Sequence, residues 1–135
     1  MDFFTNLEKY KPYEIEASKR IEKLNNTSTL NFCNNYKYDF ITSDNITYEV
    51  KTEPKSLKTN NFFIEFSGYG KPSGISTSES NFYIFCDTIN YYLIDTHKLK
   101  QIIENFTFRI VSTGDGLTFG YLISKHIIIT NSIKI

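Results

Sequence analysis

Residues 38–51, with the sequence YDFITSDNITYEVK, contain two strand-like runs on either side of a polar turn. The runs at 38–41 and 46–51 are rich in aromatic and β-branched residues, which favour strands. The four residues between them, Thr-Ser-Asp-Asn at 42–45, are typical turn formers. We therefore predict a β-hairpin that closes about Ser43 and Asp44.

The charged residues of this hairpin are expected to gather on one face. Side chains alternate along a strand, so Glu49 and Lys51 share a face, and closure of the turn places Asp39 almost opposite Glu49. Two carboxylates across a strand pair repel each other unless a partner neutralises them. A divalent cation is such a partner, and a lysine beside it can handle a water molecule. The alternative is a surface pair at a sheet edge, with Lys51 in an ordinary salt bridge.

Composition bounds the protein class. The chain has 135 residues and a mass of 15.8 kDa, so we expect residues 1–135 to form one domain with its own hydrophobic core. No apolar run approaches the roughly 20 residues of a membrane helix, and the N-terminus lacks a signal-peptide pattern, so we expect an intracellular, non-membrane protein. The formal charge of zero argues against a protein that coats nucleic acid by bulk charge.

The remaining elements are predicted from periodicity and turn residues. Pro12 followed by YEIEASKRIEKLN indicates a helix entered through the proline, with Ala17, Ile21 and Leu24 on its apolar face and Glu14 beside that face. A second helix is expected at 96–105, capped by Asp95 or Thr96, and a short helical turn is an option at 75–80. Residues 53–60 read as a polar connection and 68–74 as a loop. Residues 30–33 either start a strand or lead into one, and further strands are expected at 62–66, 82–86, 91–94, 108–111, 117–123 and 126–130.

This order of elements predicts an α+β protein with a mixed sheet. Glu65 interrupts an otherwise apolar strand, so it needs a partner, a cation or an exit to solvent. Either it extends the acidic group or it lies at a strand end.

A helix that carries Glu14, followed by Asp39-x9-Glu49-Val50-Lys51 on a hairpin and then an apolar strand, resembles the PD-(D/E)XK nuclease superfamily. The small branch with Holliday-junction resolvases and phage endonucleases is the most similar in size. The segment NNFFIEF…GKPSGISTSESNFYIF also resembles small viral and phage members, and the resemblance covers about residues 10–95. One departure is Tyr38, where the superfamily name implies proline.

The resemblance implies a restriction-endonuclease-like fold, with a central mixed β-sheet flanked by helices, and metal-dependent cleavage of DNA. Asp39, Glu49 and the carbonyl of Val50 would bind Mg2+, for which Mn2+ can substitute, and Glu14 would hold a second metal or a metal-bound water. Lys51 would position or help deprotonate the attacking water and stabilise charge in the transition state. A resolvase-like enzyme acts on branched DNA and needs two active sites, which implies a homodimer.

Three further residues are candidates for DNA contacts. Lys71 and Ser73 lie in a glycine-rich loop whose amides can hold a phosphate, and Lys55 follows the hairpin. A plain turn is the alternative for the loop. For the whole protein, the alternatives are an inactive nuclease-like fold that serves as a binding or interaction module, and a restriction-type nuclease for linear duplex.

Overall fold

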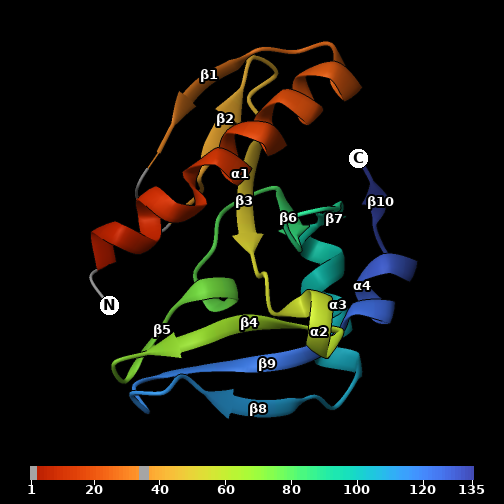
Figure 1. Ribbon diagram of the computed structural model, residues 1–135. Coiled ribbons are helices and arrows are strands. Elements are labelled where there is room, and N and C mark those ends of the chain that lie inside the picture. The colour runs from red at the N-terminus through yellow and green to blue at the C-terminus, as the bar shows by residue number, and fades with distance from the viewer. Residues whose placement is uncertain (1–2, 34–36) are drawn as a thin grey trace.

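The computed structural model describes residues 3–33 and 37–135, which form two β-sheets and four α-helices (Figure 1). The larger sheet, called sheet A, has the strand order β1 (Thr29–Phe32), β2 (Phe40–Thr42), β3 (Thr47–Thr52), β6 (Phe82–Cys86), β7 (Tyr91–Asp95) and β10 (Ile133–Lys134). Sheet B has the order β5 (Lys71–Pro72), β4 (Asn61–Gly68), β9 (Thr118–Ser124) and β8 (Arg109–Ser112). The helices are α1 (Phe3–Asn25), α2 (Ser56–Thr59), α3 (Thr96–Asn105) and α4 (Lys125–Thr130), with a 3-10 turn, η1, at Gly74–Ser76.

Sheet A is mixed, as predicted. Strands β3 and β6 pair in parallel, from Tyr48 opposite Phe82 to Thr52 opposite Cys86, while the other pairs in this sheet are antiparallel. The fold class is therefore confirmed as α+β, with a central mixed sheet flanked by helices. The division of the strands into two sheets was not predicted, because an isolated strand pattern does not say which neighbour it pairs with.

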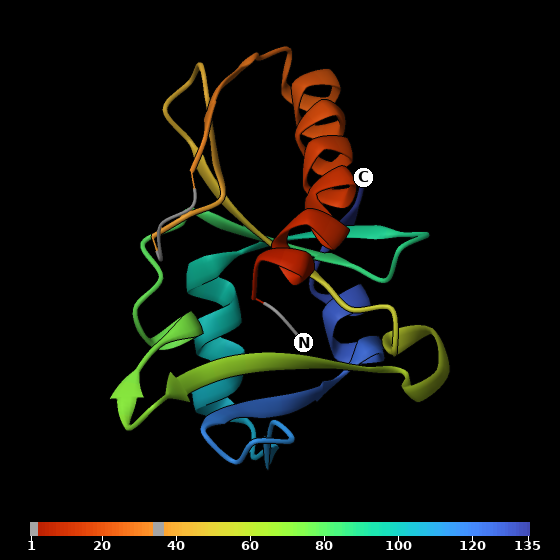
Figure 2. The ribbon, with the colours of Figure 1, turned by 60° about the vertical axis from the view of Figure 1, so that its left-hand side comes forward.

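The two faces of sheet A pack against different partners. Tyr48 on β3 and Ile84 on β6 pack with Ala17 and Ile21 of α1 in one apolar cluster. The opposite face packs against α3, α4 and sheet B through a second cluster that includes Tyr83. Figure 2 shows α1 on one side of sheet A, with sheet B and both later helices on the other. A side chain on β3 therefore faces either α1 or the space between the sheets.

Helix α1 begins at Phe3, so the prediction that the chain enters it through Pro12 was wrong. A proline inside a helix removes one N–H donor, and the helix continues past Pro12 despite that loss. The expected apolar face holds for Ala17 and Ile21, which are fully buried, but Leu24 is 50 % exposed. The sequence alone does not separate a proline in the first turn from one in the interior.

The predicted strand at 126–130 was also wrong, because these residues lie in helix α4. Ser124 caps the helix by accepting a hydrogen bond from the backbone N–H of His126. The isoleucines at 127–129 favour a strand by propensity, but burial of Ile128 in the core overrides that preference. The polar connection at 53–60 likewise contains a single helical turn, α2.

The other predicted elements agree with the structure within a few residues. The strands expected at 62–66, 82–86, 91–94, 108–111 and 117–123 correspond to β4, β6, β7, β8 and β9, and the segment at 30–33 belongs to β1. The expected helix at 96–105 is α3, whose cap is Asp95: its carboxylate accepts the N–H of Lys98. The short helical turn expected within 75–80 corresponds to η1, which lies slightly earlier in the chain, at Gly74–Ser76. Strands β5, which lies within the predicted loop at 68–74, and β10 were not predicted.

Candidate active site

The β2–β3 hairpin brings Asp39 alongside Glu49. Phe40 pairs with Tyr48, and the pairing continues one residue further through a 2.8 Å hydrogen bond from the Asp39 N–H to the Tyr48 carbonyl. The Asp39 carboxylate then turns along the strand and accepts the Val50 N–H at 2.7 Å. The Asp39 carboxylate thus satisfies a backbone N–H of β3 at a position where β2 supplies no backbone acceptor.

Glu49 and Lys51 face the space between the two sheets. Tyr48 packs under α1, and alternation along the strand sends its neighbour Glu49 to the opposite face. The Lys51 Nζ lies 3.2 Å from Glu49 Oε1, with 14 % of the Glu49 side chain exposed and 35 % of that of Lys51. The second oxygen, Glu49 Oε2, is buried and has no hydrogen-bond partner among the described residues.

Burial and nearby negative charges raise the pKa values of both carboxylates. Burial, followed by the charge of Glu49, raises the pKa of Asp39 to about 7, although the Val50 N–H acts in the opposite direction. Burial also raises the pKa of Glu49, an effect that Lys51 partly opposes. A carboxylate pair in this state gains from a bound cation, because the cation removes the repulsion and stabilises the charged forms.

The pKa of Lys51 moves in the direction that keeps it charged. Burial lowers this pKa, but the neighbouring carboxylate of Glu49 outweighs burial and raises it overall. In the metal-free protein Lys51 is therefore an ammonium at neutral pH. Such a group donates hydrogen bonds and stabilises negative charge, whereas it cannot accept a proton. This favours the electrostatic role expected for Lys51 over the role of a base.

A cavity of about 390 Å³ opens in front of Glu49 and Lys51. Its wall on the sheet B side comes from β4, β5 and η1; the residues around it are Glu49, Lys51, Glu65, Pro72, Ser73, Gly74 and Thr77. The structure therefore brings Glu65 to the same cavity as the predicted pair, and the charge of Glu65 adds to the rise in the Glu49 pKa.

A bulge and a glycine shape that wall. The register of β4 against β9 shifts between Glu65 and Ser67, and the carbonyl of Phe66 at the bulge accepts hydrogen bonds from the Ser73 N–H and the Ser76 hydroxyl. Gly74 has φ +55°, and a Cβ there would lie 2.1 Å from the Glu65 carbonyl oxygen. Because only glycine allows this approach, it holds the loop directly against the backbone of Glu65.

The predicted DNA-contact residues lie at different distances from the cavity. Ser73 lines it, and the Ser73 hydroxyl is buried with no hydrogen bond to any described residue. Lys71 is exposed on β5, two residues before Ser73. Lys55 is exposed beside α2 and lies outside the cavity lining; its charge acts on Glu53, whose carboxylate accepts the Phe63 N–H at 2.8 Å. The structure thus groups Ser73 and Lys71 with the site but not Lys55.

Glu14 is near the pair without contacting it. Its charge raises the pKa of both Asp39 and Glu49, while its own Oε1 accepts a hydrogen bond from Lys11 Nζ at 2.9 Å. Glu16, two residues further along α1, pairs with Arg20 at 3.1 Å. Within residues 3–33 and 37–135, no group of three or more His, Cys, Asp or Glu side chains is close enough to hold a metal ion. A third carboxylate ligand is therefore not assembled.

The oxygen atoms at this site nevertheless fit one hard cation. In an extended strand the N–H and C=O of a residue point to the same side, so the Val50 carbonyl lies at the edge where its N–H meets Asp39. Two carboxylates and a carbonyl are ligands that Mg2+ accepts together with water. The unpartnered Glu49 Oε2 is the observation that favours a cation here, because a buried acceptor without a donor is costly.

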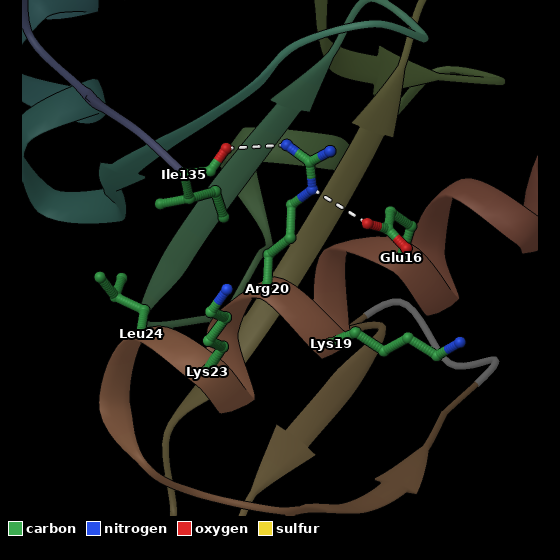
Figure 3. Close-up of a pocket in the computed structure, with 6 residues that line it drawn as sticks. All are labelled: Glu16, Lys19, Arg20, Lys23, Leu24 and Ile135. Carbon is green, nitrogen blue, oxygen red and sulfur yellow. Dashed lines mark hydrogen bonds and ion pairs between the residues drawn. The ribbon is translucent and has the colours of Figure 1, made fainter.

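A larger cavity, of about 710 Å³, is lined by α1 and by Ile135 (Figure 3). Arg20 occupies its centre: the guanidinium donates to the Ile135 carbonyl at 2.8 Å, pairs with Glu16, and stacks 4.2 Å from the ring centroid of Tyr91. These contacts tie the end of the described chain to α1. Arg20 is thus held by contacts within the protein, whereas the smaller cavity is lined by Glu49, whose Oε2 has no hydrogen-bond partner among the described residues.

Sequence reasoning missed one buried polar residue of this region, Tyr83. It pairs in register with Glu49 across the parallel β3–β6 ladder. The sequence carries no signal for that pairing, because a parallel partner is separated by a long crossover and its register cannot be read from local pattern.

No protein-family model matches the chain, and comparison with curated proteins and with solved structures gave no match. Among the described residues, no helix combines the length and apolar character needed to cross a membrane.

Proposed function

We propose that the protein is a Mg2+-dependent endonuclease that hydrolyses phosphodiester bonds in DNA, with branched DNA as its preferred substrate. The observation that carries this proposal is the partly buried Asp39–Glu49 pair with raised pKa values, in which Glu49 and the neighbouring charged Lys51 line a cavity. The resemblance of this motif to PD-(D/E)XK nucleases supplies the reaction class.

Each side chain has a defined task in this proposal. Asp39, Glu49 and the Val50 carbonyl would hold the cation, which supplies Lewis-acid activation of the phosphate and of a water molecule. Lys51, held as an ammonium by Glu49, would stabilise the negative charge that develops on the phosphate oxygens. Glu14 contributes negative charge at a distance.

The cavity wall opposite the pair suits a phosphodiester backbone. Ser73 offers a hydroxyl donor that has no hydrogen-bond partner among the described residues, and Lys71 adds a positive charge at the exposed end of the same loop. Since two strands of a junction require two cuts, the proposed active form is a homodimer.

The test is cleavage of labelled DNAs in Mg2+ or Mn2+: a four-way junction, a fork, a linear duplex and a single strand. We expect metal-dependent cutting that is lost in Asp39→Asn and in Lys51→Ala. A matched control, Glu104→Gln on α3, changes an exposed carboxylate and leaves cutting intact. Preference for the junction supports the resolvase-like role, and preference for linear duplex supports the restriction-type alternative.

A second candidate function is a non-catalytic binding module with the same fold. The absence of a third carboxylate ligand among the described residues and the net charge of zero favour it. Binding of DNA by the folded protein, without cleavage of any DNA or RNA in either metal, would establish this alternative.

A further inference from the structure

The hydroxyl of Tyr83 is the buried polar group that the proposed reaction has not used. Tyr83 is 0 % exposed, and its ring stacks on Phe85 with centroids 5.8 Å apart. It lies opposite Glu49 in the parallel ladder, so both side chains leave sheet A toward the space between the sheets. Its hydroxyl forms no well-aligned hydrogen bond with any described residue, although the hydroxyl of Ser78 is near enough to lower its pKa.

The stability of the fold gives no reason for a hydroxyl at this position. A buried hydroxyl without a partner destabilises the folded state, and phenylalanine would fill the same space without that penalty. The register that pairs Tyr83 with Glu49 places this phenol beside the candidate site, and the charges of Lys51, Glu49 and Asp39 act on it. Burial raises the pKa of Tyr83 to about 12, so the phenol is neutral under physiological conditions and has lone pairs available as an acceptor.

The ion pair between Lys51 and Glu49 suggests a role for the Tyr83 oxygen as a hydrogen-bond acceptor for Lys51. In the metal-free protein, Glu49 Oε1 orients the Lys51 ammonium. With Glu49 engaged by a cation, the Lys51 ammonium would lose part of its attraction to that carboxylate. Lys51 then needs another acceptor on the same face of sheet A, and Tyr83 provides one from the adjacent strand.

We propose that Tyr83 is a positioning residue, whose phenol oxygen accepts a hydrogen bond from Lys51 and keeps the ammonium directed at the substrate phosphate once Glu49 is engaged by the cation. This inference rests on the proposed nuclease function. It assigns to Tyr83 an effect on the rate of the chemical step and little effect on substrate binding.

The test compares Tyr83→Phe with Tyr48→Phe. Tyr48 is equally buried in the same sheet, but it faces α1, where its hydroxyl accepts a hydrogen bond from Asn25 at 3.4 Å. For Tyr83→Phe we expect kcat to fall roughly tenfold with KM within about twofold of wild type, and the urea midpoint of unfolding to stay equal or rise. For Tyr48→Phe we expect unchanged kcat and a slightly lower midpoint.

A second readout does not depend on cleavage. In wild-type protein, the nuclear Overhauser contact between the Lys51 ε-methylene and the Tyr83 ring should strengthen when Mg2+ is added, and Asp39→Asn should abolish that change. Unchanged kcat in Tyr83→Phe, or a contact that does not respond to Mg2+ in a cleaving enzyme, overturns the role of Tyr83 alone. Failure of the wild-type protein to cleave any substrate removes the proposed function and, with it, this role.

Discussion

The Asp87–Lys125 pair and the partly buried Glu49–Lys51 pair differ in how well their hydrogen bonds are satisfied. Asp87 is fully buried and accepts hydrogen bonds from the Lys125 ammonium and from backbone N–H groups of Ile89 and Asn90. Burial acts to raise the Asp87 pKa, but these donors outweigh burial and lower it to about 2. This pair joins α4 to the turn between β6 and β7.

The pair at the cavity has the opposite character. Glu49 meets Lys51 through one oxygen only, its other oxygen lacks a donor among the described residues, and Asp39 adds a second negative charge. At Asp87, the fold supplies enough hydrogen-bond donors for a buried carboxylate, and the same is not true at Glu49 in the described part of the chain. The cation of the proposed function would supply the partner that Glu49 Oε2 lacks among the described residues.

The largest expected effect comes from breaking the satisfied pair. Lys125→Met leaves Asp87 buried without its counter-charge and should reduce the free energy of unfolding by about 3–5 kcal/mol, measured by urea denaturation. The control Lys98→Met, at an exposed position on α3, should change it by less than about 0.5 kcal/mol. A loss below about 1 kcal/mol for Lys125→Met would show that the pair is not a structural tie.

A cation should stabilise the incompletely paired site. At a Mg2+ concentration about 100 times its dissociation constant, the free energy of unfolding should rise by about 2.7 kcal/mol, because the cation binds only the folded site. The comparison is urea denaturation in Mg2+ and in EDTA. Asp39→Asn should lose the gain and Glu104→Gln should keep it; an equal gain in Asp39→Asn would place the cation elsewhere.

The two sites should respond to pH in opposite directions. The folded pKa of Asp39, about 7, exceeds its ordinary value of 3.8, so folded protein binds more protons than unfolded protein between these pH values. The stability that this group contributes is present below about pH 4 and is lost as the pH rises through 7, a change on the order of 4 kcal/mol. For Asp87, the contribution is present above its ordinary value of 3.8 and is lost as the pH falls toward 2.

This prediction is checked by urea denaturation in EDTA from pH 4 to pH 8. The decline in the free energy of unfolding toward pH 8 should flatten in Asp39→Asn, because the asparagine does not titrate. A wild-type profile that rises steadily over this range would contradict the assigned pKa direction.

The smallest expected effect comes from two buried serine hydroxyls. Ser56 donates to the Glu53 carbonyl at 2.7 Å, so Ser56→Ala should lower the free energy of unfolding by about 1 kcal/mol. Ser73 has no internal partner among the described residues, so Ser73→Ala should leave stability within about 0.5 kcal/mol of wild type or raise it. The same variant should weaken DNA binding. A loss of stability as large as that of Ser56→Ala would show that Ser73 has a structural role.

Much of the candidate site could be predicted because it is built from local pattern. Alternation along a strand and a turn of known residues are short-range properties, and they were sufficient to place Asp39 near Glu49 and Lys51 on one face. The same reasoning found most strands and α3. It failed at α4, where burial of Ile128 outweighs the strand propensity of its neighbours.

The amino-acid sequence by itself determined the α+β class, the hairpin and the close approach of Asp39 to Glu49 near Lys51. Only the tertiary structure decided that Glu65 and Ser73 complete the cavity, that Glu14 pairs with Lys11 instead, and that Tyr83 stands beside Glu49. The physical reason is range: hydrogen bonds within a hairpin depend on a few neighbouring residues, whereas parallel pairing and the packing of two sheets depend on the whole chain.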